Sequence, residues 1–373
     1  MSDEELVPVS LAQLAQYFLA LGTTGFGGPI ALAGRMQHAL VVERRWFSRR
    51  DFLDGLTLAQ LAPGPMAAQL AMYLGALQGG WIGATVVGLA FILPSFFIVW
   101  ILAAAYVRFG GLPWIGAAFY GIGAVVIAII ARAGWKLAAS TLGRRPLLWG
   151  IWLAMLAATI WSGREIVWLL IAAGLVPVAL KAATRSGVNG ASLAAVLPLG
   201  SANAPALFLF FMKAGVFVFG SGLAIVPFLY GEVVERYHWL SDRQFLDSVG
   251  VAMMTPGPVV ITATFIGYLV DREAGMIAAS IGVFLPAYLI VLVCARRFRE
   301  LTSRPAVRLF VDGVTAGASG AMAAAVFLLG RRAIIDMPTV AIALVAVILP
   351  AISKINETWL ILPAAVVGLL LKG

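Results

Sequence analysis

Long uninterrupted apolar segments constrain this chain more than any other feature. Residues 81–107, 113–132 and 274–294 each match the ~20 apolar residues that a helix needs to cross a bilayer. Hydrophobic residues make up 62% of the 373-residue chain and charged residues only 12%, whereas soluble domains are about half apolar and about a quarter charged. Only helices and closed barrels satisfy their backbone groups inside lipid. Because the runs are continuous rather than alternating, we predict an all-α polytopic membrane protein.

The chain also contains an internal repeat. Residues 46–65, WFSRRDFLDGLTLAQLAPGP, align without a gap to residues 239–258, WLSDRQFLDSVGVAMMTPGP, at an offset of 193 residues, and half of the positions are identical. We therefore expect two homologous halves: a first transmembrane repeat (residues 1–183), a linker (184–204) and a second repeat (205–373). Many secondary transporters are built from duplicated units of this kind.

Each half is predicted to cross the membrane about five times and to add one Pro-Gly-Pro re-entrant hairpin. The expected crossings of the first half are residues 11–34, 81–107, 113–131, 147–161 and 166–180, and its hairpin is residues 52–77. Those of the second half are residues 206–230, 274–295, 309–330, 334–352 and 358–371, and its hairpin is residues 245–270.

An odd number of crossings places the second half upside down, so we predict inverted repeats. Most of the Lys and Arg residues then lie in loops on one side of the membrane, which the positive-inside rule assigns to the cytoplasm. A hairpin at residues 11–34 would make the number even and remove this argument.

The charged and sulfur-containing residues exclude several classes of function. The net charge of +9 comes from bases in short loops between apolar runs, which is typical of membrane proteins and does not indicate nucleic-acid binding. Cys294 is the one cysteine, so an intrachain disulfide and a multi-thiolate metal site are excluded. His38 and His238 are not repeat partners. We expect no metal site and no cofactor.

Two kinds of helix interruption recur in both halves. They are Gly25-Phe26-Gly27-Gly28-Pro29, matched by Phe219-Gly220-Ser221-Gly222, and Ala62-Pro63-Gly64-Pro65, matched by Thr255-Pro256-Gly257-Pro258. Pro removes a backbone donor and Gly permits unusual dihedral angles, so each cluster is expected to break its helix. A helix that restarts after a break presents unpaired N–H groups and a partial positive charge, which favours anion binding. Two inverted copies would bring such ends together near the midplane, whereas the alternative is a kink that only aids packing.

Polar side chains near these breaks are further candidates for anion binding. Lys213 lies in the apolar run at residues 207–218, either as a countercharge for an anion or as a lysine that extends to the membrane surface. Gln60, Gln69 and Thr255 flank the Pro-Gly-Pro triplets and either donate to an anion or join neighbouring helices.

Two acidic residues, Asp54 and Asp247, occupy equivalent positions near the start of the two hairpins. One interpretation is that they cap a helix or pair with Arg50 and Arg243. The other is that they carry protons during transport.

The motifs GFGGP, WFSRRDFLDGLTLAQLAPGP, FGSG, WLSDRQFLD and TPGPVVITATFIGY resemble those of the chromate ion transporter family. The resemblance covers both halves and matches the long, two-domain form. It implies a prokaryotic inner-membrane protein that exports chromate and confers chromate resistance, with sulfate as a competitor. The family's marked positions fall on Gly27, Gly28, Pro29, Gln60, Pro63, Gly64, Pro65, Gln69, Gly220, Gly222, Pro256, Gly257 and Pro258. One departure is Met253, which stands where many members have Gln.

Other functions remain as alternatives at this stage. The cargo is chromate in the first hypothesis and sulfate or another inorganic oxyanion in the second. An intramembrane enzyme is a weaker alternative, because the chain has no flavin or haem motif, and we expect no enzymatic activity. A channel is a third. The expected partners are the anion and the lipid bilayer, and a homodimer is left open.

Overall fold

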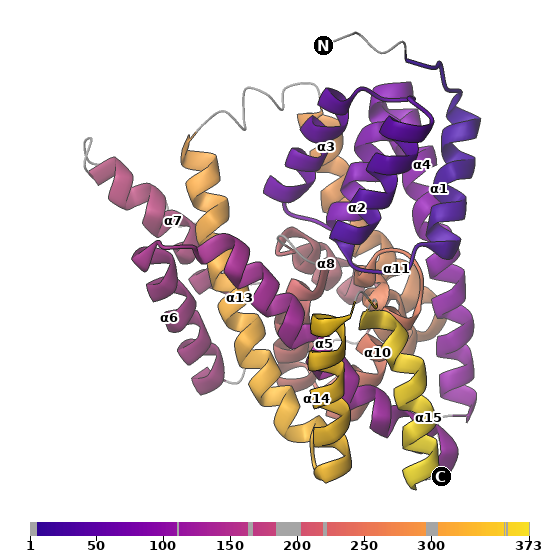
Figure 1. Ribbon diagram of the computed structural model, residues 1–373, viewed down its shortest axis with the longest axis vertical. Helices are drawn as coiled ribbons and strands as arrows, with labels where there is room; N and C mark the ends of the chain where they lie inside the picture. Colours follow the sequence, from indigo (N-terminus) through magenta and orange to yellow (C-terminus); the bar gives the residue numbers. More distant parts are fainter. Residues whose placement is uncertain are drawn as a thin grey trace.

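The computed structural model describes residues 6–109, 112–162, 167–183, 203–218, 222–295, 305–353, 355 and 357–372. Within these residues every regular element is helical (Figure 1). The all-α class that the continuous apolar runs predict is therefore confirmed for the described part of the chain. The expected linker at residues 184–204 lies almost entirely outside it.

The two halves contain similar series of helices. The first half consists of α1 (Leu11–Thr24), α2 (Pro29–Gln37), η1 (His38–Glu43), α3 (Arg49–Leu61), α4 (Met66–Phe109), α5 (Pro113–Leu142), α6 (Pro146–Ser162) and α7 (Val167–Ala183). The second consists of α8 (Ala204–Val216), η2 (Gly222–Ile225), α9 (Val226–Leu229), η3 (Tyr230–Arg236), α10 (Asp242–Met254), η4 (Val259–Ile261), α11 (Thr262–Cys294), α13 (Pro305–Ala333), α14 (Met337–Ile352), η5 (Glu357–Leu360) and α15 (Ile361–Lys372).

Four helical stretches among the described residues are long and apolar enough to cross a membrane. They are α4, α5, α13 and the stretch Val259–Cys294, which joins η4 to α11. Shorter apolar helices, among them α6, α8 and α14, pack around them. The chain is therefore a multi-pass membrane protein by the length and composition of its helices.

The longest helices, α4 and α11, each fold back on themselves. The dihedral angles are non-helical at Gly79-Gly80 in α4 and at Asp271-Arg272 in α11. A Cβ atom on Gly83 would lie 2.0 Å from the carbonyl oxygen of Gly75, although eight residues of straight helix would separate the two by about 12 Å. We call residues 66–78 and 81–109 the first and second arms of α4, and residues 262–270 and 273–294 the arms of α11.

Residues 11–34 do not form the single crossing that we predicted. Helix α1 ends at Thr24, and α2 runs back beside it, so the Arg35 guanidinium donates to the Thr24 carbonyl at 3.1 Å and the Val7 N–H donates to the Arg45 carbonyl at 2.9 Å. The reversal occurs where Gly27 adopts φ 116°, a region that favours glycine, and Pro29 then starts the new helix.

The predicted crossing at residues 206–230 is interrupted in the same way. Phe210 of α8 stacks on Phe228, with ring centroids 5.7 Å apart, and lies 5.4 Å from the ring of Trp239. The equivalent rings of the first half, Tyr17 and Trp46, are 6.5 Å apart. The predicted crossings at residues 11–34 and 206–230 are therefore each folded back on themselves, and the parity argument for inverted repeats no longer applies.

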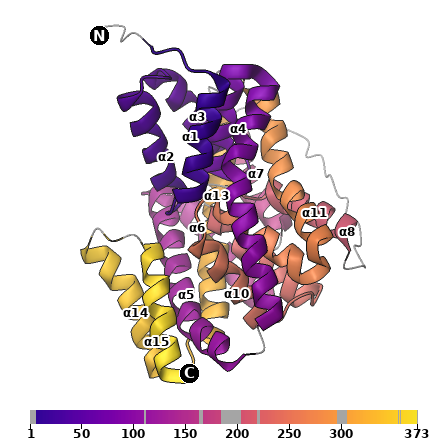
Figure 2. The same cartoon turned by 90° about the vertical axis from the view of Figure 1, so that its right-hand side faces the viewer.

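The two halves meet along the second arms of α4 and α11. Thr85, near the start of the α4 arm, shares a hydrogen bond of 2.7 Å with Tyr288, near the end of the α11 arm. The two arms are therefore antiparallel. In agreement, α1 and α3 of the first half lie at one end of the molecule, whereas α14 and α15 of the second half lie at the other (Figures 1 and 2).

The last helices of each half pack against the opposite half, an arrangement that we call the exchanged packing. Helices α6 and α7 lie on α13, and α14 and α15 lie on α5. Glycines permit both contacts: a Cβ on Gly313 would lie 2.0 Å from the carbonyl oxygen of Ala173, and one on Gly121 would lie 1.9 Å from that of Ala364. Such small residues let helix backbones approach closely in membranes.

We expect Gly83→Ala to destabilise the protein by about 1–3 kcal/mol, because its methyl group would overlap the Gly75 carbonyl and force the arms of α4 apart. The measurement is thermal unfolding of the purified protein in detergent. The matched control is Gly150→Ala on α6, where a Cβ atom meets nothing within 4 Å. Equal melting temperatures for the two variants would contradict the described contact.

Candidate functional site

The repeated helix breaks are sharp turns of the backbone. Three of their glycines adopt positive φ: Gly27 at 116°, Gly64 at 135° and Gly257 at 98°. Around the Pro-Gly-Pro triplets the helix stops at Leu61 and restarts at Met66, and in the second half it stops at Met254 and restarts at Val259. The expected interruption of the helix at each triplet is therefore found.

The breaks of one half are hydrogen-bonded to the breaks of the other. The N–H of Gly64 donates to the carbonyl of Val218 at 2.7 Å, and the N–H of Gly257 donates to the carbonyl of Gly25 at 2.9 Å. The offset of 193 residues relates Gly64 to Gly257 and Gly25 to Val218, so these are two copies of one interaction. We call them the paired break bonds. They relate the two halves by an approximate twofold axis.

Four helical segments begin around one small cavity between these breaks. Its lining includes Gly27 and Pro29 at the start of α2, Pro65, Met66 and Ala67 at the start of α4, Gly222 at the start of η2, and Gly257, Pro258 and Val259 at the start of η4. None of the described residues that line it carries a charged side chain. Its volume is about 10 Å³, which is room for about one water molecule. We call it the central cavity.

The electrostatic character of the central cavity comes from backbone groups. The first turns of a helix leave N–H groups without partners inside the helix and carry a partial positive charge. At Gly28 and Pro258, the residues that precede α2 and η4, no side chain caps these groups. An anion placed among these helix ends would accept hydrogen bonds from them.

Gln69 is the one buried polar side chain of the first Pro-Gly-Pro break. It is 0% exposed, and its side-chain amide donates to the Pro63 carbonyl at 2.7 Å. Its Oε1 atom has no hydrogen-bond partner within the described residues. In the second half the equivalent position is Thr262, whose hydroxyl donates to the Val259 carbonyl at 2.8 Å. Both side chains therefore tie down the backbone beside the central cavity.

The predicted site residues fall into four groups. Those that line the central cavity are Gly27, Pro29, Pro65, Gly222, Gly257 and Pro258. Those that belong to the same breaks without lining it are Gly28, Pro63, Gly64, Gln69, Thr255 and Pro256. Gln60 and Lys213 are exposed outside it, and the Lys213 ammonium lies 5.9 Å from the centre of the Phe228 ring. Gly220 lies outside the described residues.

Ser95 is a residue of the site that we did not single out from the sequence. It is 0% exposed, and its hydroxyl donates to the Pro256 carbonyl at 2.7 Å. Its equivalent in the first break is Ala287, which lies against Gly64. The available signal was the aligned pair Pro94 and Pro286, because each precedes the residue that contacts a Pro-Gly-Pro triplet.

Metal-binding clusters are not found in the part of the chain that the structure describes, where no group of three or more His, Cys, Asp or Glu residues comes together. The chemistry that the described site offers is therefore backbone hydrogen bonding and helix-end electrostatics.

Comparison with known proteins identifies related chains. A family model described as "Chromate transporter" matches residues 12–178 and 205–369. A chromate transport protein of Cupriavidus metallidurans is 50% identical over 372 residues, covering 96% of this chain and 93% of the relative. A probable chromate transport protein of Synechococcus elongatus is 48% identical, covering 97% and 95%, and a chromate transport protein of Pseudomonas aeruginosa is 32% identical, covering 97% and 92%. No solved structure matches.

We expect Ser95→Ala to destabilise the protein by about 1–3 kcal/mol, because the Pro256 carbonyl would lose its buried donor. Thermal unfolding in detergent measures the change. Ser140→Ala is the control, because Ser140 is exposed and its hydroxyl bonds a carbonyl three residues back in its own helix. A melting temperature for Ser95→Ala within error of Ser140→Ala would contradict the assigned hydrogen bond.

Proposed function

Because this chain belongs to the chromate transporter family, we propose that it is a secondary transporter that carries chromate out of the cell through the central cavity. The family points to a transporter rather than an enzyme. Its bacterial relatives support a place in the inner membrane of a prokaryote, where export of chromate gives resistance. The observation that carries the proposal is the convergence of four helix starts on one cavity between the two halves.

Tetrahedral dianions suit a site of this kind. Chromate carries four oxygens that point in four directions, and the helix starts around the central cavity approach it from both halves of the chain. Backbone N–H groups are fixed donors, so they can replace the water that the anion gives up on leaving solution. Sulfate has the same shape and charge. Since no charged or long polar side chain lines the cavity, we expect sulfate to compete.

The central cavity is closed in this conformation. A volume of about 10 Å³ is too small for a tetrahedral oxyanion. The breaks must therefore separate for chromate to enter, and the paired break bonds, Gly64 to Val218 and Gly257 to Gly25, lie where that separation must occur. We infer that opening to either side of the membrane stretches these contacts.

Inverted repeats fit this mechanism and form part of the proposal. The antiparallel second arms of α4 and α11, joined by Thr85 and Tyr288, support inversion independently of any count of crossings. In the same proposal, α3 with the first arm of α4, and α10 with the first arm of α11, are re-entrant hairpins that carry the Pro-Gly-Pro breaks to the midplane. Gly55 of α3 lies against Tyr73 of the first arm. Irregular backbone at that depth is tolerated when protein surrounds it.

The membrane potential supplies the driving force in this proposal. Moving one charge across 100 mV is worth about 2.3 kcal/mol, so a dianion that leaves a negative-inside cell gains roughly twice that. We therefore expect chromate to accumulate on the positive side of proteoliposomes under an imposed potential, with excess sulfate reducing the flux. Vesicles that hold folded protein but move no chromate at any potential would overturn the proposed cargo.

The variant Gly28→Asp separates anion binding from stability. Gly28 precedes α2 with dihedral angles that any residue adopts (φ −68°, ψ 171°), and a Cβ there meets nothing within 4 Å. Aspartate in this position caps a helix and stabilises it by roughly a few tenths of a kcal/mol relative to glycine. Its negative charge, however, would occupy the helix start that we assign to the anion. We expect unchanged or higher thermal stability with at least about a tenfold loss of chromate flux.

The control for this variant is Gly28→Ser, which caps α2 without adding a charge. We expect Gly28→Ser to keep both stability and transport within about twofold of the original chain. If Gly28→Asp transported chromate as well as Gly28→Ser does, the start of α2 would not be part of the anion site.

A further inference from the structure

A second and larger cavity lies at the end of α10 that is remote from its Pro-Gly-Pro break. Its volume is about 600 Å³, and it is enclosed by the starts of α5 and α10 and the ends of α13 and α15. Its charged and titratable lining residues are Tyr120, Asp242, Arg243, Asp247, Arg332 and Lys372. Unlike the central cavity, it is therefore surrounded by ionisable side chains. We call it the charged cavity.

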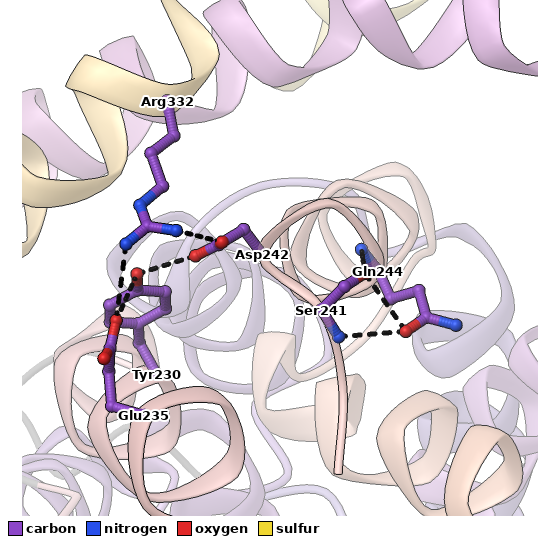
Figure 3. A network of polar contacts seen from close by, with 6 residues as sticks. All are labelled: Tyr230, Glu235, Ser241, Asp242, Gln244 and Arg332. Carbon is purple, nitrogen blue, oxygen red and sulfur yellow. Dashed lines mark hydrogen bonds and ion pairs between the residues drawn. The ribbon is translucent and has the colours of Figure 1, made fainter. Parts of the chain in front are cut away.

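Most of the charges around this cavity are already paired. Figure 3 shows Arg332 between Glu235 and Asp242, with the Tyr230 hydroxyl within hydrogen-bond distance of both carboxylates, at 2.9 and 2.7 Å. The same view shows Ser241 and Gln244 capping the start of α10.

Lys372, another cation that lines the charged cavity, is paired with Asp336. The Lys372 ammonium lies 3.8 Å from Asp336, whose carboxylate also accepts from the Tyr120 hydroxyl at 2.5 Å. Lys372, like Arg332, therefore already has an acidic partner.

Arg243 is different from the other two cations. It makes no ion pair and no hydrogen bond with any described side chain that lines the charged cavity. Its guanidinium is packed beside Gly116, where a Cβ atom would lie 2.5 Å from Nη2. Asp247, one helical turn further along α10, interacts with Arg243 electrostatically without such a contact.

Asp247 is a buried carboxyl with one hydrogen-bond donor. Its side chain lines the charged cavity but the residue is only 4% exposed, and its Oδ2 atom accepts from the Tyr106 hydroxyl of α4 at 2.7 Å. Burial raises the pKa of the Asp247 carboxyl to about 6, against the opposing effects of the Tyr106 hydrogen bond and the Arg243 charge. Asp247 therefore changes its charge within the physiological range of pH.

All elements packed around Asp247 have to be considered in this balance. The charged and titratable groups that face it are Tyr106 on α4, Tyr120 on α5, Asp242 and Arg243 on α10, Arg332 on α13 and Lys372 on α15. The part of α11 that the structure describes adds no charged group to the lining. Since Arg332 and Lys372 are paired, protonation of Asp247 leaves the charge of Arg243 uncompensated.

We propose that Asp247, held by Tyr106, is a proton-binding site that controls the entry of the oxyanion: protonation of Asp247 leaves the charge of Arg243 uncompensated, so that Arg243 binds the anion in the charged cavity. This inference rests on the proposed function and adds a coupling site to it. Linkage makes the effect reciprocal, so a bound oxyanion favours the proton on Asp247 as much as the proton favours the oxyanion.

The charged cavity and the central cavity are joined by α10. Asp247 lies in the second turn of this helix, and Thr255 at the Pro-Gly-Pro break follows eight residues later, about 12 Å along the axis. An anion bound beside Arg243 is therefore close to the helix starts that we assign to transport. Protonation of Asp247 also removes a negative charge from that path.

The test compares Asp247→Asn with the original chain in proteoliposomes, with chromate flux measured between about pH 5 and pH 7. Asparagine mimics the protonated carboxyl. A carboxyl with a pKa of about 6 is protonated roughly ten times less often at pH 7 than at pH 5. We therefore expect the ratio of variant flux to original flux to rise from about 1 at pH 5 to about 10 at pH 7.

Using this ratio removes a confounding effect. Chromate itself exchanges a proton near neutral pH, and its own titration cancels when both proteins are measured in the same buffers. Asp312→Asn is the matched control, because Asp312 pairs with Arg145 away from the charged cavity. Its flux ratio should stay constant with pH. A constant ratio for Asp247→Asn as well would overturn the inference.

Tyr106→Phe gives a second measurement that holds even where Asp247→Asn does not reconstitute. The Tyr106 hydroxyl donates to the ionised carboxylate, so its loss disfavours the charged form and raises the pKa of Asp247. We expect the midpoint of the pH–flux profile, normalised to its own maximum, to move to higher pH. An unmoved midpoint would overturn the inference.

The failure of the inference and the failure of the proposed function look different in this experiment. If the original chain moves chromate but neither variant changes the pH profile, chromate transport is supported and the proposed role of Asp247 is contradicted. If the original chain moves no chromate at any pH, the proposed function itself is contradicted.

Discussion

The need to satisfy broken backbone inside a membrane shapes the rest of this structure. Each Pro-Gly-Pro or glycine cluster frees N–H and carbonyl groups that lipid cannot hydrogen-bond. The chain solves this by turning the breaks of the two halves toward each other, so that Gly64 donates to Val218 and Gly257 donates to Gly25. The twofold relation of the halves and the position of the central cavity between the breaks follow from that mutual satisfaction.

The same requirement explains why the site carries so little side-chain chemistry. Where the donors are backbone groups at helix starts, glycine and proline are the residues that matter, since glycine supplies the positive φ at Gly64 and Gly257 and proline starts the next helix. Ser95 and Gln69 stabilise this backbone because their side chains donate hydrogen bonds to the carbonyls of Pro256 and Pro63. At the charged cavity, Arg243 supplies positive charge, one helical turn from the Asp247 carboxyl.

The sequence predicts the helical class, the repeat and the location of the breaks, because these depend on local composition and on self-similarity. It did not predict that residues 11–34 fold back on themselves. Residues 11–34 have the length and hydrophobicity of a span, but the same composition suits two shorter helices folded together, as α1 and α2 are. The contacts of Arg35 with Thr24 and of Val7 with Arg45 distinguish the two arrangements.

Tertiary contacts also decided which polar residues lie near the site. Ser95 follows Pro94, which aligns with Pro286 in the repeat, but its role depends on a carbonyl in the other half, at Pro256. Lys213 was a candidate because of its apolar neighbours, but α8 ends a few residues later and leaves it exposed. Periodicity within one helix cannot report which face its neighbours cover.

The exchanged packing has a consequence for the order of assembly. Helices α6 and α7 find their partner surface on α13, which the ribosome makes only after most of the second half. The face of α5 that packs against α15 stays uncovered until α15 has been made. The first half is therefore inserted in the membrane with two unfilled surfaces, and it reaches its final form only when synthesis is complete. Two halves made as separate chains would have to find each other in the bilayer before either had finished folding.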